Sequence, residues 1–348
     1  LTEKNNMKLG FVTKTILSSA TAAAIAISAT GASAADNRSY ILATASTGGT
    51  YYPVGVAIAT LSKVKLEPKF GLSVSAISSA GSGENIKLLR EDQAQFAILQ
   101  GLYGAWAWDG EGPFESSGKQ TELRSVSMLW QNVEHFVLKS DLAKTGTVAD
   151  LKDLEGTNNK FSIGTKNSGT EGSGRQQLKG LKIDPDKFAL AYMGYGASAD
   201  AMQNGNIEGM NTPAGVPVSA VTRLYASMGD KVKVLDFTDE QIKEANGNYD
   251  LWTRYVIPAN TYPGQTKDIN TVAQPNFLAT NANLLEEDVY QLTKSLYENL
   301  PYLSAIHKAT SVMSIEKAIA GLPVPLHPGA ARYYRERGIS IPARLIAQ

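Results

Sequence analysis

Three short loops rich in Gly, Ser and Thr carry most of the chemistry that this sequence offers. They cover residues 46–52 (STGGTYY), 79–85 (SAGSGEN) and 167–171 (NSGTE), and each lies after a β-prone run and before a helical pattern. The first N–H groups of a helix lack partners and carry a partial positive charge, and glycine lets a ligand approach the backbone closely. Such loops can bind a carboxylate or a phosphate without any lysine.

For any one of these loops, the alternative role is simple helix capping by Ser or Thr. Three of them in one chain favour a shared anion site, because ligands of open α/β sheets bind beyond the carboxyl ends of the strands, where these loops lie. The loops match neither the G-x-x-x-x-G-K-[ST] nor the G-x-G-x-x-G pattern, so nucleotide binding is not indicated.

Residue patterns typical of catalysis or metal binding are missing. The chain has no Cys and three separated histidines, His135, His307 and His327, none of which belongs to an H-x-x-x-H pair. A G-x-S-x-G elbow is absent, and no Ser/His/Asp arrangement is apparent. We therefore expect neither an enzyme nor a bound metal or cofactor, and we expect His327, in a proline-rich turn, to be structural.

Further candidates stand beside the three loops. Gln100 ends a strand and can point its amide at a ligand, and residues 211–215 (NTPAG) follow another strand in the second half. Tyr51 and Tyr52 either contact the ligand or pack between lobes. Arg175 could reach an anion, although such a residue more often faces water. Packing is the expectation for the aromatic residues of the helix after Gln100, which are Tyr103, Trp106 and Trp108.

The elements that must position these residues alternate between strand and helix. β-prone runs lie at 40–45, 72–78 and 95–100, and helical patterns lie at 54–64 and 80–92. The same rhythm returns with strands at 160–164, 188–193 and 206–210. The stretches 80–99 and 194–210 share one plan of small-residue loop, helix, polar turn and strand. This pattern predicts two α/β lobes, each with a mostly parallel sheet flanked by helices.

Two longer segments are expected to connect these lobes. The β-rich run 125–139 lies between the two halves, and the proline-punctuated run 251–280 lies near the other end. Helical patterns at 288–300 and 314–322 then return to the first lobe. The predicted organisation is a first part of lobe I at 35–134, lobe II at 135–250, and a return to lobe I with C-terminal helices at 251–348.

Composition and charge exclude several partners. Of the 348 residues 43% are apolar, and 33 basic residues balance 33 acidic ones. A chain without net charge has no global field for nucleic acid or an anionic membrane, and phosphate polymers need clustered Lys and Arg. Disorder is excluded by the apolar fraction. We expect a globular protein that binds no nucleic acid.

The N-terminal segment resembles an export signal. Lys8 and Lys14 precede an alanine-rich apolar stretch from Ile16 to Ala29, and residues 32–34 (ASA) form an A-x-A cleavage site. Residues 1–34 are therefore expected to be a cleaved signal peptide, with a membrane anchor as the alternative. Its removal leaves 30 basic and 32 acidic residues. A cysteine-free exported chain fits the bacterial periplasm.

At these loops the chain resembles the TAXI family, the extracytoplasmic solute receptors of TRAP transporters. The resemblance spans nearly all of the chain after residue 34 and rests on the segments STGGTYYPVG (46–55), AGSGENIKLL (80–89), SGTEGSG (168–174), PAGVP (213–217), IPANTYPGQ (257–265) and GLPVPLHPGAARYYRERG (321–338). It implies a type II periplasmic-binding-protein fold, with two α/β lobes, a hinge and a ligand cleft between them. The implied ligand residues are Gly48, Gly49, Thr50, Tyr51, Tyr52, Gly81, Ser82, Gln100, Ser168, Gly169, Thr170, Thr212 and Gly215.

The resemblance further implies a function. Such a receptor captures a small organic anion, such as glutamate or 2-oxoglutarate, by lobe closure and delivers it to a TRAP permease driven by an ion gradient. A monomer is expected. One departure affects the solute: many relatives have Q-x-D after the third strand, whereas Gln100 is followed here by Gly101 and Leu102. The missing Asp shifts the expectation from an amino acid toward a dicarboxylate or keto acid, unless Glu84 or Glu171 replaces it.

Two other hypotheses stay open at this point. The same kind of receptor could serve an ATP-driven (ABC) importer or a sensor instead of a TRAP permease. The fold could also carry an enzyme, although the sequence shows neither an acid–base pair nor a metal cluster for one.

Overall fold

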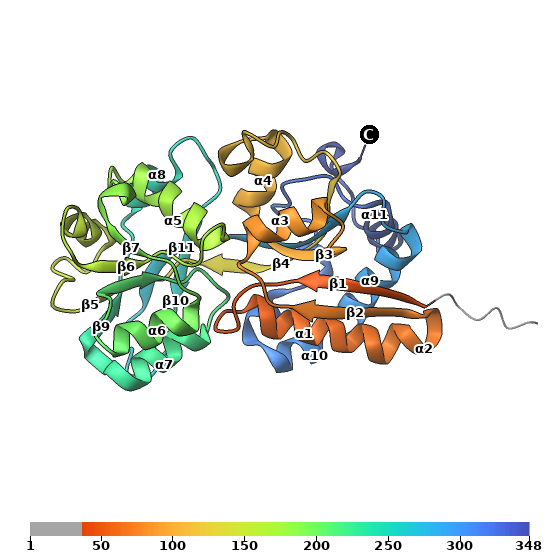
Figure 1. The fold of residues 1–348 in the computed structure, drawn as a ribbon. Coiled ribbons are helices and arrows are strands. Elements are labelled where there is room, and N and C mark those ends of the chain that lie inside the picture. Colours follow the sequence, from red (N-terminus) through yellow and green to blue (C-terminus); the bar gives the residue numbers. More distant parts are fainter. Residues whose placement is uncertain (1–36, 348) are drawn as a thin grey trace, which may run out of the picture. The chain divides into compact units, whose positions relative to one another are not determined.

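The computed structural model describes residues 37–347, which form two α/β lobes, each with its own sheet (Figure 1). The signal peptide predicted at 1–34 lies outside the described residues. No helix of the described part is long and apolar enough to cross a membrane. The alternation of strands and helices predicted from the sequence is confirmed in both lobes. The mostly parallel sheets that were expected are wrong, because both sheets combine parallel with antiparallel strand pairs.

The first lobe is built on a six-stranded sheet in the order β10-β11-β3-β1-β2, with β4 paired to β11, but the edge strand β10 lies in the second lobe, where Ile257 packs in that lobe's core (Figure 1). The strands β1, β2 and β3 are parallel, whereas β11 runs antiparallel to β3. Its strands are β1 (Arg38–Ala43), β2 (Leu72–Ile77), β3 (Phe96–Gln100), β4 (Leu123–Val133), β10 (Thr253–Ile257) and β11 (Ile269–Asn281). Its helices are α1 (Tyr51–Leu61), α2 (Glu67–Phe70), α3 (Ser82–Arg90), α4 (Gly101–Asp109), α9 (Glu286–Glu298), α10 (Leu300–Ile306) and α11 (Pro328–Glu336).

The second lobe contains a five-stranded sheet in the order β7-β6-β8-β5-β9. Its strands are short: β5 (Phe136–Lys139), β6 (Lys160–Ser162), β7 (Ala189–Ala191), β8 (Gly209–Asn211) and β9 (Val232–Val234). Its helices are α5 (Gly169–Gly180), α6 (Tyr195–Gln203), α7 (Ser219–Met228) and α8 (Asp239–Asn246). Phe136, Phe161 and Phe237 are fully buried in its core, and Phe136 stacks on Phe161 with ring centroids 6.3 Å apart.

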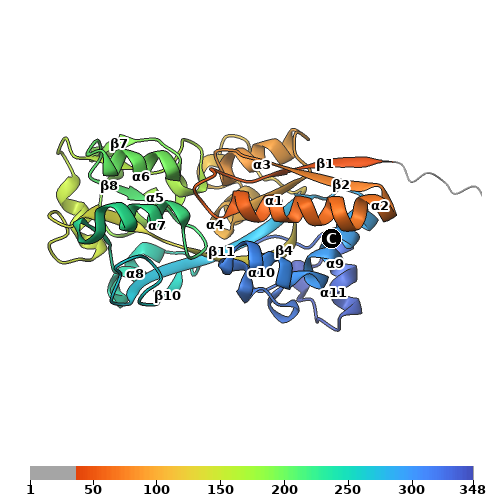
Figure 2. The same cartoon turned by 90° about the horizontal axis from the view of Figure 1, so that it is seen from below.

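Two long antiparallel strands, β4 and β11, run between the lobes. They pair from Val133 opposite Ala273 to Leu123 opposite Asn281. The first part of β11 also pairs with β10, and its last part pairs with β3, so one strand extends across both regions, as Figure 2 shows. These strands lie in the two segments expected to cross between lobes. The exact lobe boundaries derived from the sequence stay a prediction.

The first helix begins earlier than the sequence pattern indicated. The loop was expected at residues 46–52 and the helix at 54–64, but α1 begins at Tyr51, and Pro53 lies in its first turn. Proline is tolerated there because the first helical N–H groups have no intrahelical acceptor. Val54, Ala57, Ile58 and Leu61 face the core with helical spacing. The early start makes Tyr51 the first residue of a helix rather than part of a loop.

Candidate functional site

The N-terminal ends of five helices meet at one small cavity between the lobes. Four of the helices contribute their first residue or the one before it, and α4 contributes Gln100, its N-cap. The cavity volume is about 30 Å³, room for little more than one water-sized group. Its lining residues are Ala45, Ser46, Gly49, Tyr51, Ala80, Gly81, Ser82, Gln100, Thr165, Ser168, Gly169, Thr170, Gly194, Tyr195 and Pro213.

The electrostatics of this cavity favour an anion. None of the lining residues is charged, so the local field comes from the helix ends and other dipoles. Each N-terminus is equivalent to about half a positive charge. The N-cap residues of α1, α3, α4 and α6 make no side-chain cap bond, so simple Ser or Thr capping does not explain these four N-termini. Some of their first-turn N–H groups are already paired, because Leu102 N–H donates to Gln274 Oε1 at 2.9 Å and Glu84 N–H donates to the Asn167 carbonyl at 3.2 Å.

The N-terminus of α5 differs from the others. The Ser168 hydroxyl accepts a hydrogen bond from the N–H of Glu171 at 3.0 Å, so Ser168 is the N-cap of this helix. The capping alternative thus describes Ser168, which also lines the cavity.

Ser168→Ala therefore tests two roles at once. We expect it to lower the free energy of unfolding by about 1 kcal/mol through loss of the cap. We also expect weaker anion binding, because an uncapped first turn holds its N–H groups less firmly. Denaturant unfolding and calorimetry on the same preparation measure both. A variant with normal stability and normal affinity would contradict this description of the loop.

Eight of the thirteen residues predicted from the sequence line the cavity, and five do not. The eight are Gly49, Tyr51, Gly81, Ser82, Gln100, Ser168, Gly169 and Thr170. Outside it, Gly48 faces Gly196, the Thr50 hydroxyl donates to the Gly215 carbonyl at 2.8 Å, and Thr212 is buried behind the wall. Tyr52 is partly buried in the first turn of α1. Direct ligand contact by all thirteen stays a prediction.

Tyr195, which was not among the residues predicted from the sequence, lines the cavity from the second lobe. Its hydroxyl donates to the Pro213 carbonyl at 2.7 Å and bonds with the Thr170 hydroxyl at 2.6 Å. Burial raises the pKa of Tyr195, so the phenol keeps its proton and can act as a donor. The sequence pattern could have identified Tyr195, because Gly194-Tyr195-Gly196 belongs to the small-residue segment of the second α/β copy, equivalent to the loop before α3.

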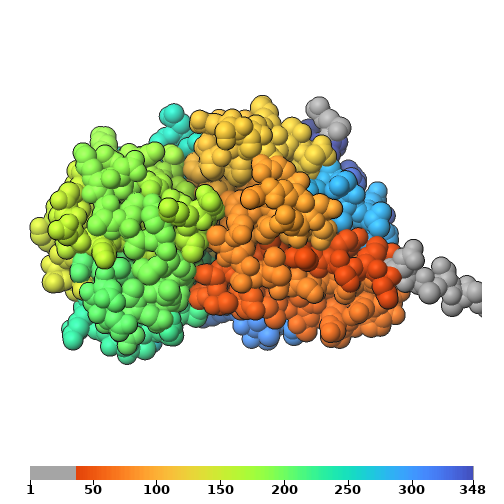
Figure 3. Space-filling model, viewed as in Figure 1, coloured from red at the N-terminus to blue at the C-terminus, as the bar shows by residue number. Residues whose placement is uncertain are grey.

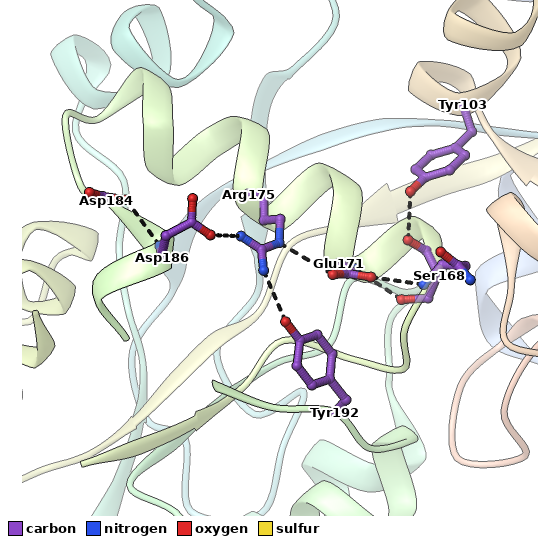
Figure 4. Close-up of polar contacts among 8 residues, drawn as sticks. Tyr103, Ser168, Glu171, Arg175, Asp184, Asp186 and Tyr192 are labelled. Atoms are coloured by element: carbon purple, nitrogen blue, oxygen red, sulfur yellow. Dashed lines mark hydrogen bonds and ion pairs between the residues drawn. The ribbon is translucent and has the colours of Figure 1, made fainter. Parts of the chain in front are cut away.

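The two lobes touch through polar side chains and bare backbone. The Ser219 hydroxyl donates to the Gly48 carbonyl at 2.9 Å, and the Thr165 hydroxyl donates to the Ala80 carbonyl at 3.1 Å. Tyr103 was expected to serve packing, yet its hydroxyl donates to the Ser168 carbonyl at 2.9 Å (Figure 4). These bonds describe a closed arrangement, and Figure 3 shows the two lobes abutting on this face.

The charged residues considered as ligand contacts lie outside the cavity. Arg175 is held by Glu171 at 3.3 Å, Asp186 at 2.6 Å and the Tyr192 hydroxyl at 3.0 Å (Figure 4). Glu171 also accepts from the Asn167 N–H, and Glu84 accepts from the Ala80 N–H. Arg175, Glu171 and Glu84 line an outer groove of about 790 Å³ instead. Their charges stabilise the loops and do not enter the cavity.

All three histidines have structural partners away from the cavity, and His307 Nδ1 accepts a hydrogen bond from the Ala309 N–H at 3.2 Å. His135 is fully buried, with Nε2 2.7 Å from the Tyr262 hydroxyl, and burial lowers its pKa to about 4. His327 was expected to be structural, and its Nδ1 accepts a hydrogen bond from Gly329 N–H at the start of α11. Among residues 37–347 there is no cluster of three His, Cys, Asp or Glu side chains that could hold a metal ion.

Glu134 is a buried carboxyl at the point where the chain passes from β4 to β5. Its side chain is fully buried, and its Oε1 accepts hydrogen bonds from Gln177 at 2.7 Å and Ser173 at 3.4 Å. Burial raises the pKa of Glu134 from 4.5 to about 7, because the charged form loses its hydration. The folded protein therefore binds a proton here that the unfolded chain releases above pH 4.5.

This shift predicts a pH-dependent effect of Glu134→Gln. The carboxyl's contribution to stability is greatest below pH 4.5 and is lost as the pH rises to about 7, while the amide does not titrate. A pKa difference of this size corresponds to about 3 kcal/mol. The variant should therefore gain stability relative to wild type by up to that amount between pH 4.5 and 7.5. Denaturant unfolding of both proteins across this range measures it, and a difference independent of pH would contradict the assignment.

The architecture and the site together define a class of protein. Two α/β lobes, two long connecting strands, and uncapped helix N-termini around one interlobe cavity are features of the periplasmic binding-protein fold. The family model of the NMT1-like family matches residues 42–338, so the chain belongs to the NMT1-like family. This match does not single out the TAXI subfamily.

Solved structures share the fold. MatC from Rhodopseudomonas palustris, with bound malate, superposes with a TM-score of 0.53 at 14% identity, covering 86% of this chain and 96% of that one. The periplasmic binding protein BugD gives 0.51 at 12%, covering 86% and 93%. A binding-protein component of an ABC phosphonate transporter from Pseudomonas aeruginosa gives 0.49 at 11%, covering 79% of each. At these identities the likeness concerns the fold alone.

Proposed function

We propose that this protein is a periplasmic solute receptor that captures a small organic anion between its lobes and delivers it to a membrane importer. The observation that carries the proposal is the cavity bordered by the N-terminal ends of five helices and lined by no charged residue. Fixed N–H groups recognise a carboxylate or a similar oxyanion without the desolvation of a lysine. A dicarboxylate, a keto acid or an acidic amino acid fits this chemistry.

Capture requires the cavity to open and close. At about 30 Å³ the cavity holds no molecule of this size in the arrangement described. The solute would bind to the first lobe, and the second lobe would close over it by bending at β4 and β11. The closed state must be favoured by the solute, and moving the population from 1:99 to 99:1 takes about 5.5 kcal/mol of differential affinity.

Two transporter classes are candidates for the membrane partner. An ion-gradient-driven TRAP permease is supported by the motif resemblance to the TAXI family. Import driven by ATP, the alternative expected from the sequence, has the better support from the comparisons: the family match does not single out TAXI, and one fold neighbour is named as part of an ABC transporter. The gene beside this one separates them: a fused large permease gene indicates TRAP, and an ATPase gene indicates ABC import.

An enzyme remains the less supported alternative. The described residues place no His and no carboxyl in the lining of the cavity, so neither a nucleophile–base pair nor an acid–base pair lines it. Turnover of a carboxylate by the purified protein would restore this hypothesis.

A thermal-shift screen tests the receptor proposal. The panel contains C4 to C6 dicarboxylates, keto acids, acidic amino acids, alkanesulfonates and phosphonates, with an organic cation as the control. A ligand at 100 times its Kd stabilises by about 2.7 kcal/mol, which should raise Tm by on the order of 5 °C. We expect an anion to produce this shift and the cation to produce none. A panel in which no anion raises Tm would refute the proposal.

A further inference from the structure

A row of buried polar side chains continues from the cavity along the crossing strands. Gln100, which lines the cavity, lies opposite Asn276 on the neighbouring strand, and Gln274 lies opposite Asn132. Glu134 follows Asn132 by two residues. Each of the five is at most 3% exposed. Core positions on paired strands are normally apolar, so a row of buried polar side chains beside a ligand cavity indicates a role other than packing.

Several groups of this row have no hydrogen-bond partner among the described residues. The unpaired atoms are Gln100 Oε1, Asn132 Oδ1 and Nδ2, Glu134 Oε2, Gln274 Nε2 and Asn276 Nδ2. Each buried polar atom without a partner costs about 1–3 kcal/mol, and native proteins contain few of them. Their concentration next to the helix N-termini is the pattern expected where a protein receives the polar groups of a ligand.

Glu134 is the one member of the row that can carry a charge. No Lys or Arg of the described residues lies within 4 Å of its carboxyl oxygens. The amides can present either a donor or an acceptor to a ligand. An ionised carboxylate only accepts, and when buried it needs a cation or several donors. The side chain of Glu134 therefore restricts what kind of group can lie beside it.

Helix α5 places Glu134 close behind the cavity wall. Thr170 lines the cavity, and Ser173, three residues later on the same face of α5, bonds to Glu134. Gln177, a further turn along, is its other partner. Successive turns of a helix are about 5.4 Å apart, so the carboxyl lies about one turn beyond the residue that borders the cavity. A short bifunctional solute can span such a separation when the lobes are slightly parted.

We infer that the solute is a zwitterion whose carboxylate binds at the helix N-termini and whose ammonium group is directed to Glu134. This inference rests on the proposed receptor function and narrows it to amino acids. It reverses the shift toward keto acids that the missing Asp after Gln100 suggested, because a crossing strand supplies the carboxyl instead. Neither Glu84 nor Glu171 can do so from the outer groove. Glu134 thereby becomes the residue that sets specificity.

Calorimetry with matched pairs of probes tests the inference. The pairs are L-glutamate with 2-oxoglutarate and L-aspartate with succinate, which share carboxylates and differ in the ammonium group. We expect the wild type to prefer one amino acid over its partner by at least about tenfold, the effect of one charge-assisted hydrogen bond. Glu134→Gln should lose at least that factor for the amino acid while its affinity for the ammonium-free partner stays within about twofold.

Control variants distinguish the outcomes. Glu208→Gln removes a carboxyl of the second lobe that pairs with Lys139 and lies outside the cavity, and it should bind like wild type. Denaturant unfolding establishes that Glu134→Gln is folded. Equal affinity of wild type for both members of each pair, or an equal loss of both in Glu134→Gln, would overturn the role of Glu134 while leaving the receptor function intact. Binding of no carboxylate to wild type would overturn both proposals.

Discussion

Gly48→Val should raise the apparent Kd for the solute by about 100-fold or more while leaving the fold intact. A Cβ at position 48 would lie 2.7 Å from the backbone nitrogen of Gly196, across the lobe interface. Two backbones meeting without side chains cannot accommodate the extra atoms, so the closed arrangement becomes unfavourable. If only about 1% of the receptors can adopt the closed state, the apparent affinity falls about 100-fold. Ligand contact by Gly48 stays a prediction, and the structure adds a contact of this glycine with the second lobe.

The facing residue provides the matched control for Gly48. A Cβ on Gly196 would meet only the Arg223 guanidinium, at 3.6 Å, which is ordinary contact. Gly196→Ala should therefore bind the solute like wild type. Small-angle scattering distinguishes closure from ligand contact, because solute should contract wild type and Gly196→Ala but not Gly48→Val. Normal affinity of Gly48→Val would mean that this lobe contact is not part of the bound state.

Gln100→Glu should abolish anion binding, with an affinity loss of at least about 100-fold. The substitution keeps the size of the side chain and adds a carboxylate to a cavity where Gln100 Oε1 has no partner among the described residues. The N-termini of α3, α4 and α5 would stabilise this new charge, and it would repel a solute carboxylate.

Gln176→Glu is the control for the added charge. Gln176 lies on α5 and lines the outer groove, so its substitution changes the net charge equally without entering the cavity. Calorimetry should give it wild-type affinity. If Gln100→Glu retained full affinity for carboxylates, the cavity would not be an anion site.

Glycines illustrate how far local sequence can be interpreted. Glycine-rich loops before helices predicted bare N–H groups, because that property depends only on neighbouring residues. The sequence did not predict that glycines in and beside these loops also allow close contact with segments distant in the chain. A Cβ on Gly83 would lie 2.2 Å from the Asn167 carbonyl, and one on Gly172 would lie 2.3 Å from the Tyr103 hydroxyl. These contacts join segments some 70–85 residues apart, and no local pattern encodes such pairs.

The sequence by itself determined the alternation of strands and helices, the two-lobed α/β class and eight residues of the cavity lining. These features follow from hydrophobic periodicity, from turn-forming residues and from the rule that loops after parallel strands gather at one sheet edge. Only the tertiary structure decided that Tyr195 completes the wall, that Arg175 is held by neighbouring side chains, and that Glu134 stands behind the cavity. Glu134 lies in a strand-rich segment beside His135, where nothing local marks it. Burial by residues distant in the sequence raises the pKa of its carboxyl, because the free energy of a charged group depends on the solvent and residues around it.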